Sequence, residues 1–188
     1  DCPRVEGDTR VAGGWAEGYQ SSGGNEAWIN GTYNGSLWQS YAHEMLHNYG
    51  LNHANFLDCS FEILDQNCSS YPYGDGLNVM GNADLFHRAT NLNVIQKFRL
   101  GWIPESNIKV VEDNTTDVEY DIYPIGSNLP SGALYGLHIE LATDRHVYVE
   151  YRQPFNYDAD LAYETFIPQN GLTIHWIHSP NHPIQPRL

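Results

Sequence analysis

The sequence predicts an α+β fold, with helices in the first half of the chain and antiparallel strands in the second. Before Pro104, apolar residues recur at helical spacing; beyond it, apolar and polar residues alternate with a period of two. The 188 residues are 41% apolar and 13% aromatic, which is enough to build a core for one large or two small domains. We therefore expect two regions, residues 1–104 and residues 105–188.

The first predicted elements lie in a segment rich in Gly, Ser and Asn, where residues 15–19 and 26–30 favour two short strands. A helix is predicted over residues 37–49, because Ser36 is a good N-cap and Gly50 can take the left-handed conformation that ends a helix. The two strands would be the last ones of a sheet whose beginning is missing. We therefore expect the chain to be a piece of a longer precursor.

Residues 54–83 contain turn residues and a close pair of cysteines, which predicts an irregular loop held by a covalent link. A disulfide between Cys59 and Cys68 would stabilise the fold by about 2–3 kcal/mol on the chain-entropy model. The competing interpretation is two reduced thiols in a core.

Another helix is predicted around residues 92–98, with Thr90 or Asn91 as its N-cap and Gly101 as its stop. Beyond it, four segments of alternating or β-branched residues predict antiparallel strands that pack on one another like a sandwich. These segments are residues 118–125, 133–141, 146–152 and 172–178.

The charge balance restricts the partners of the protein. There are 23 acidic residues against 9 Lys and Arg, which gives a formal net charge of -14. Such a chain repels phosphate backbones and anionic lipid headgroups, and its apolar runs are too short to span a membrane. We expect a protein or glycoprotein partner, with no nucleic acid and no membrane insertion.

Glycosylation motifs indicate a secreted or extracellular protein. Four Asn-x-Ser/Thr acceptor sites occur, at Asn30, Asn34, Asn67 and Asn114. A disulfide would fit the same compartment. Cys2 is the odd cysteine, and its partner is expected upstream; the alternative is a thiolate that reaches a metal and keeps the protein latent.

The predicted helix over residues 37–49 carries candidate metal-binding and catalytic residues. His43 and His47 are four residues apart, so both imidazoles lie on one face of the helix and can reach one ion. A turn after the helix lets His53 return as a third ligand, and Glu44 lies beside the open coordination position. This pattern predicts a catalytic zinc site with one ion per chain, rather than three ordinary surface or core histidines.

Zinc held by three neutral imidazoles, with a fourth position open, acidifies a bound water and polarises a carbonyl. Glu44 can take the proton of that water and deliver it to a leaving amine. The site chemistry therefore predicts peptide hydrolysis without a covalent intermediate.

This long zinc motif resembles that of the metzincin clan of metalloendopeptidases. Metzincins place a methionine under the zinc histidines in a tight turn, and Met80, 27 residues after His53, is the candidate, with an ordinary core methionine as the alternative. Residues 27–54, 73–83 and 98–104 resemble the gametolysin family, secreted proteases that digest algal cell-wall glycoproteins. The resemblance implies a metzincin-like zinc protease domain with a truncated N-terminal part, followed by the β-rich module.

The leading hypothesis is a secreted zinc endopeptidase that hydrolyses peptide bonds of extracellular or cell-wall glycoproteins. Asn82 stands two residues after Met80, where astacins and serralysins have a zinc-binding tyrosine, so no tyrosine is identified as a stabiliser of the oxyanion. The tyrosine-rich segment 71–73 is a candidate wall of the substrate pocket.

Two other classes of function compete with this hypothesis. One is a non-catalytic, matrix-binding glycoprotein that retains a metzincin fold, although such a protein has no need of the base Glu44. The other is a zinc hydrolase that acts on something other than peptides, because the ligands alone do not define the substrate.

Two further groups of residues have metal-ligand chemistry. They are His175, His178 and His182, and Asp58, Asp65 and Asp75. Histidines three apart on a strand point to opposite faces, which argues against a second transition-metal site. The aspartates could hold calcium, but Asp next to Gly is usually a turn residue, so the turn interpretation is favoured. In the predicted strand 146–152, Glu150 and Arg152 favour a buried ion pair over a docking surface.

Overall fold

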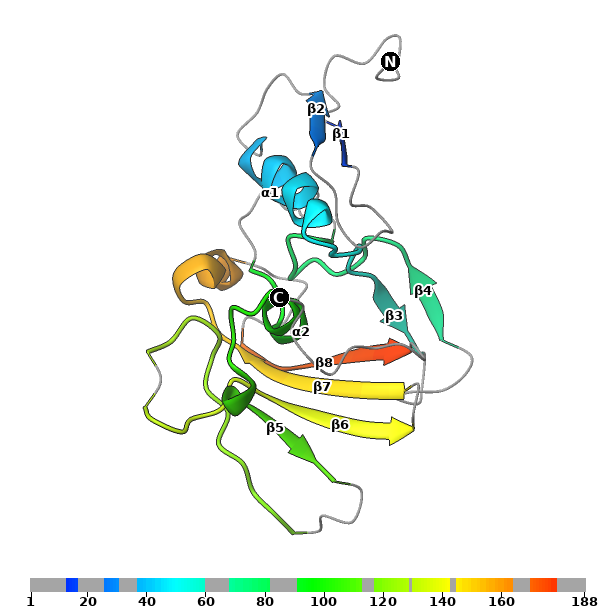
Figure 1. Cartoon of the computed structure of the whole chain (residues 1–188). Coiled ribbons are helices and arrows are strands. Elements are labelled where there is room, and N and C mark those ends of the chain that lie inside the picture. The colour runs from blue at the N-terminus through cyan, green and yellow to red at the C-terminus, as the bar shows by residue number, and fades with distance from the viewer. Residues whose placement is uncertain are drawn as a thin grey trace. The chain divides into compact units, whose positions relative to one another are not determined.

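Figure 1 shows the computed structural model of the chain, in which helices and sheets are combined. The predicted α+β class is therefore confirmed. The chain divides into two compact units, Asp1–Asn91 and Leu92–Leu188. The structure describes residues 13–16, 26–30, 37–59, 68–81, 91–112, 117–128, 130–142, 145–163 and 170–178.

The first unit contains a strand pair and a helix near the predicted positions. The first strand begins two residues before the predicted segment 15–19, and residues 17–19 lie outside the described residues. Strand β1 (Gly13–Ala16) pairs antiparallel with strand β2 (Ala27–Asn30). Helix α1 spans Leu37–Asn48, one residue shorter than predicted. The helix ends where Gly50 takes a φ of 82°, the left-handed conformation expected at this position.

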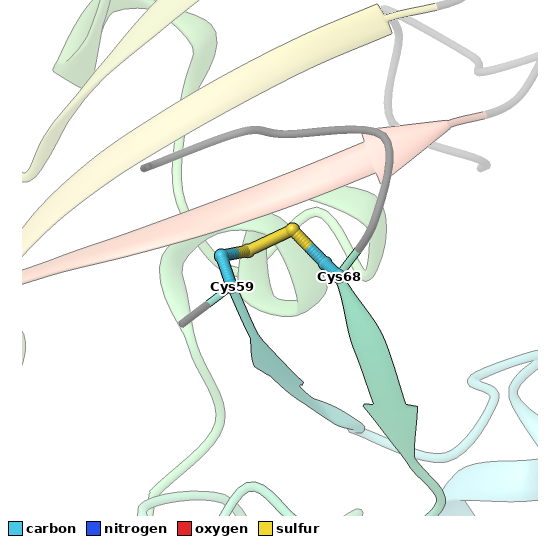
Figure 2. The surroundings of a disulfide bond; sticks show 2 residues. All are labelled: Cys59 and Cys68. Carbon is cyan, nitrogen blue, oxygen red and sulfur yellow. A yellow bond between two sulfur atoms is a disulfide. The ribbon is translucent and has the colours of Figure 1, made fainter. Parts of the chain in front are cut away.

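A disulfide-linked hairpin follows α1. Strand β3 (Phe56–Asp58) pairs antiparallel with strand β4 (Ser69–Tyr71), so part of the segment expected to be irregular is a short sheet. Figure 2 shows that Cys59 comes directly after β3, that Cys68 comes directly before β4, and that a disulfide joins them. The predicted cysteine pairing is confirmed, and the interpretation as two reduced thiols is wrong.

The second unit contains a four-stranded mixed sheet with the order β5-β6-β7-β8 (Figure 1). Strand β5 runs parallel to β6, whereas β6 with β7 and β7 with β8 are antiparallel pairs. Short 3-10 helices precede β5 and follow β7. The bounds are η2 Glu105–Asn107, β5 Ile108–Val111, β6 Gly136–Ala142, β7 Arg145–Arg152, η3 Asn156–Tyr163 and β8 Gly171–His178.

The structure corrects the predicted strands of this unit. Within the described ranges, the predicted strand 118–125 makes a single isolated bridge, from Ile122 to Leu134, and Pro124 has no N–H with which to continue a ladder. Strand β5 was missed because its four residues are too few to show an alternating pattern. The described strands of the unit form one sheet in place of the expected sandwich.

Helix α2 (Val94–Arg99) packs against β7 in the second unit. Asn93 Oδ1 accepts from Gln96 N at 2.9 Å, and Gln96 Oε1 accepts from Asn93 N at 3.2 Å. This capping box makes Asn93 the N-cap, instead of Thr90 or Asn91 as predicted. The buried core that α2 shares with the sheet comprises Val94, Ile95, Phe98, Ile103, Ile108, Ile125 and Tyr148.

From the sequence, we expect this helix to belong to the region of residues 1–104. The boundary between residues 104 and 105 stays a prediction. In the structure, the contacts of α2 place it in the unit that begins at Leu92. None of the described helices combines the length and the apolar character needed to cross a membrane.

A buried ionic network joins α2, β7, η3 and β8. Arg152 donates to Glu150 Oε1 at 3.1 Å and makes two hydrogen bonds to the carboxylate of Asp158, at 3.0 and 2.6 Å. Glu150 also accepts from Val94 N at 2.6 Å and lies 3.0 Å from His175 Nε2. The predicted buried ion pair between Glu150 and Arg152 is therefore confirmed, since both side chains are almost fully buried.

Two opposing effects determine the pKa of Glu150. Burial raises this pKa, but the charges and hydrogen bonds of His175 and Arg152, with the Val94 N–H, outweigh burial and lower the pKa to about 2. Glu150 is therefore ionised at neutral pH although it is fully buried.

Candidate metal centre

Three histidine side chains converge in the first unit. His43 and His47 lie one turn apart on α1, and their Nε2 atoms are 3.1 Å apart. His53 lies beyond the helix, and its Nε2 is also 3.1 Å from Nε2 of His47. Within the described part of the chain, these three form the group of side chains that could hold a metal ion, with ligand atoms within 4.8 Å of one another. The structure thus brings together the residues that the sequence predicts as ligands.

The turn after α1 returns His53 to the helix. Leu51 N donates to Leu46 O at 3.1 Å, and Gly50 N donates to His47 O at 2.8 Å. These are the two hydrogen bonds of a Schellman motif, which reverses the chain at the end of a helix. Because the reversal takes only a few residues, the imidazole of His53 reaches the side of α1 that carries the other two rings.

Main-chain carbonyls define the tautomers of two of these histidines. His43 Nδ1 lies 2.9 Å from Val79 O, and His47 Nδ1 lies 2.7 Å from Leu51 O. A carbonyl oxygen can only accept, so each Nδ1 must carry the proton and donate it. In the neutral rings, Nε2 then carries a lone pair. These lone pairs face the place where the Nε2 atoms converge, which is the orientation that metal-binding histidines use.

The spacing of the nitrogens fits a shared cation. Two neutral imidazole lone pairs 3.1 Å apart repel each other unless a positive charge lies between them. Nitrogens that ligate zinc at about 2.1 Å in tetrahedral geometry lie about 3.4 Å apart, close to the distances seen here. Three histidines of this chain can therefore hold a metal ion.

The surroundings favour the neutral form of two of these imidazoles, His47 and His53. Burial lowers the pKa of His47, the hydrogen bond to Leu51 O raises it, and the neighbouring His43 lowers it again, so that the net shift is downward. Burial lowers the pKa of His53 to about 4, with additional lowering by His47 and His43. Neutral imidazole is the form that binds a metal, so ligation at neutral pH requires no proton to be displaced from Nε2.

Glu44 follows the first histidine on α1, and its side chain is buried. Burial raises the pKa of its carboxyl group. A carboxylate with a raised pKa is a better proton acceptor than an exposed one, as a general base requires. Glu44, the neighbour of His43 on α1, therefore has the electrostatics that a general base requires.

Gln39 lies four residues before His43 on α1, and its side chain is 2% exposed. Neither the Nε2 nor the Oε1 atom of its amide has a hydrogen-bond partner among the described residues. A buried amide without partners costs folding free energy, so this position carries a stability penalty.

The predicted methionine lies in a tight, buried turn. Gly81 N donates to Asn78 O at 2.8 Å, and Asn78 Oδ1 accepts from Met80 N at 2.9 Å. Met80 is fully buried. A Cβ at Gly81 would overlap the carbonyl oxygen of Asp75, so the turn requires glycine there.

This turn supports the histidines through its main chain. Val79 O is the acceptor that orients His43, and Met80 O accepts from Ala54 N, directly after His53, at 2.8 Å. The turn is thus bonded to one ligand and to the neighbour of another. That the Met80 side chain packs under the imidazoles stays a prediction.

The structure adds Tyr73 to the site. Its ring centroid lies 3.7 Å from that of His53 and 6.0 Å from that of His43. From the sequence, segment 71–73 is predicted only as a candidate wall of the substrate pocket. No known motif places a tyrosine at this distance in sequence from the histidines.

No model of a known protein family, no curated protein and no solved structure matches this chain. The assignment of a functional site therefore rests on the geometry of His43, His47 and His53 and on the residues around them.

The structure assigns turn and network roles to the weaker candidates. Asp75 Oδ1 accepts from Leu77 N at 3.0 Å, which is a turn contact of the kind expected for Asp in such a segment. His175 lies 3.0 Å from Glu150 in the ionic network. Neither Asp58 nor Asp75 belongs to a group of metal-ligating side chains within the described ranges.

Several predicted residues lie outside the described residues. They are Cys2, Asn34, Ser36, Asp65, Asn67, Asn82, Asn114 and His182, together with the side chains of Asn30 and His178. The glycosylation sites and the role of Cys2 stay predictions.

Proposed function

We propose that this protein is a secreted zinc-dependent endopeptidase of the gametolysin family of metzincins, which hydrolyses peptide bonds of extracellular or cell-wall glycoproteins. One observation carries the proposal: the Nε2 atoms of His43, His47 and His53 converge, with Glu44 buried next to the first of them. Three imidazoles leave a fourth position for substrate or water, as a catalytic zinc site requires.

The residues of the chain have distinct roles in this reaction. When bound, zinc supplies a Lewis acid that polarises the substrate carbonyl and acidifies a water. His43 and His47 present their Nε2 lone pairs because their Nδ1 protons are donated to main-chain carbonyls. Glu44 takes a proton from the water and delivers it to the leaving amine, and the burial that raises its pKa favours this exchange.

The disulfide between Cys59 and Cys68 supports secretion, since disulfides persist in oxidising compartments. The four Asn-x-Ser/Thr motifs agree with the same compartment. A net charge of -14 fits a neutral or basic protein substrate better than an anionic polymer.

Metal analysis combined with a digestion assay tests the proposal. We expect about one zinc ion per chain, cleavage of casein or gelatin, loss of cleavage with a chelator, and recovery when zinc is restored. Glu44→Gln should keep the metal, because Glu44 is not a ligand, and should lower the cleavage rate by about 10²–10⁴-fold. The matched control is Glu105→Gln, an exposed glutamate of the second unit, which should cleave as the wild type does.

Two results would contradict the proposal. A wild-type chain that binds zinc but cleaves no protein would favour the matrix-binding glycoprotein. Cleavage by Glu44→Gln at the wild-type rate would remove Glu44 from the mechanism.

A further inference from the structure

Tyr73 packs directly on the third histidine of the candidate metal centre. Its ring centroid is 3.7 Å from that of His53, and the two ring planes are inclined by 36°. The Tyr73 side chain is 39% exposed. The aromatic ring therefore contacts the imidazole while part of the residue remains accessible to solvent.

The backbone of Tyr73 adopts a costly conformation to place this ring. Its φ is 59°, in the left-handed region that bulky residues rarely occupy. Tyr73 N donates to Asn55 Oδ1 at 3.1 Å, which ties this residue to the segment that carries His53. A Cβ at the next residue, Gly74, would lie 2.6 Å from Cβ of Phe56, so the chain packs closely against β3 here.

Glycine or asparagine would occupy this left-handed position at a lower conformational cost than tyrosine. A strained non-glycine residue that persists beside a cluster of ligands is the kind of outlier from which a functional role can be inferred. The feature of Tyr73 that glycine lacks is the ring that contacts His53.

The contact itself indicates what the ring does. His53 comes from the segment after the helix, and its imidazole lies against the ring of Tyr73, with the ring centroids 3.7 Å apart. Because an imidazole can rotate about its side-chain bonds, a ring packed against it limits the directions in which Nε2 can point.

We infer that Tyr73 is a positioning residue that holds the imidazole of His53 in its metal-binding orientation through direct contact between the two rings. This inference rests on the metal site of the proposed function. It assigns the effect to the aromatic ring, whereas the phenolic hydroxyl is not required.

Zinc affinity of the full chain, measured by competition with a chromophoric chelator, tests the inference. Tyr73→Gly removes the ring and relieves the backbone, and we expect it to weaken zinc binding by about 10–100-fold, as loss of other supporting groups does. Tyr73→Phe keeps the ring and should bind within about threefold of the wild type. Tyr71→Ala is the matched control on the same hairpin, because the ring of Tyr71 pairs with Phe56.

Two further readouts separate positioning from a general structural role. The melting temperature of the metal-free Tyr73→Gly protein should equal or exceed that of the wild type, because glycine relieves the left-handed strain. Its Co²⁺-loaded form should show altered d–d absorption bands, since the third nitrogen would no longer be fixed. If Tyr73→Gly does not fold, Tyr73→Asn tolerates the same φ and replaces it in both measurements.

Several outcomes would overturn the inference. Zinc affinity of Tyr73→Gly within about threefold of the wild type would show that the ring does not position His53. Equal losses in Tyr73→Phe and Tyr73→Gly would assign the effect to the hydroxyl, and an equal loss in Tyr71→Ala would assign it to the hairpin as a whole. A wild-type chain that binds no zinc would instead refute the proposed function, and this inference with it.

Discussion

Replacing Cys59 and Cys68 with serine should open the hairpin of β3 and β4 without unfolding the second unit. All six strand residues of this hairpin are exposed, so little apolar burial holds the strands together. The three cross-strand pairs contribute roughly 0.2–1 kcal/mol each, and a two-stranded hairpin is at best marginally stable in water. The disulfide is therefore the strongest single restraint on the hairpin.

The cost of removing the disulfide follows from its loop length. A sequence separation of 9 residues corresponds to about 2.7 kcal/mol on the chain-entropy model. Since about 1.4 kcal/mol changes an equilibrium tenfold, the open fraction of the hairpin should rise about 100-fold. Tyr73 follows β4 by two residues, so the same change should weaken zinc binding.

Hydrogen exchange measured by mass spectrometry tests this prediction. Peptides that cover β3 and β4 should exchange about 100-fold faster in the double serine variant, whereas peptides from β6 and β7 serve as the internal reference and should not change. A rise of less than tenfold in the hairpin would show that other contacts hold it. An equal rise in β6 and β7 would show that the disulfide stabilises the whole chain instead.

Three other predictions concern single positions. Gly81→Ala should weaken zinc binding about tenfold or more, because its Cβ forces the turn and the carbonyl of Val79 to move; unchanged affinity by chelator competition would refute this. Gln39→Met should raise the free energy of unfolding by about 1 kcal/mol in urea titrations, because it removes unpaired buried amide atoms; a loss of stability would show that the amide is satisfied. The pKa of Glu150 is lowered on folding, so the stability it contributes is present above pH 4.5 and is lost as pH falls towards 2. The wild type should therefore lose more stability than Glu150→Gln between pH 5 and pH 3, and equal losses would contradict the lowered pKa.

The ligands of the candidate site could be predicted because they depend on local geometry. The spacing of His43 and His47 determines that they share a helix face, and Gly50 indicates where the chain turns. The Cys59–Cys68 link was also predicted from a short separation. In each case, the partners lie within about one turn or one loop of each other, where sequence spacing constrains distance.

Two of the groups that orient the ligands, Val79 O and Tyr73, could not be predicted, because they are distant in sequence from the histidines that they contact. His43 and its acceptor Val79 are 36 residues apart. Every residue has a main-chain carbonyl, so the residue type at position 79 does not indicate that its carbonyl accepts this hydrogen bond. Tyr73 reaches His53 through a strained turn that no periodicity predicts.

The strands of the second unit show the same limit. Segment 118–125 has strand-like residues, but among the described residues it makes one isolated bridge instead of a continuous ladder. Strand β5 forms because β6 offers it a parallel edge, and this pairing depends on the tertiary fold rather than on four residues.

The main-chain acceptors at Val79 and Leu51 have a consequence for anyone who transfers this centre to another scaffold. Because the acceptors are carbonyl oxygens, another apolar residue at either position would present the same acceptor to the histidine. A mutational scan should accordingly find Val79 and Leu51 tolerant of conservative exchange, whereas Gly50 and Gly81 should tolerate almost none. A transferred site therefore needs the backbone of both turns. Copying the three histidines without those turns would leave the tautomers of His43 and His47 undefined.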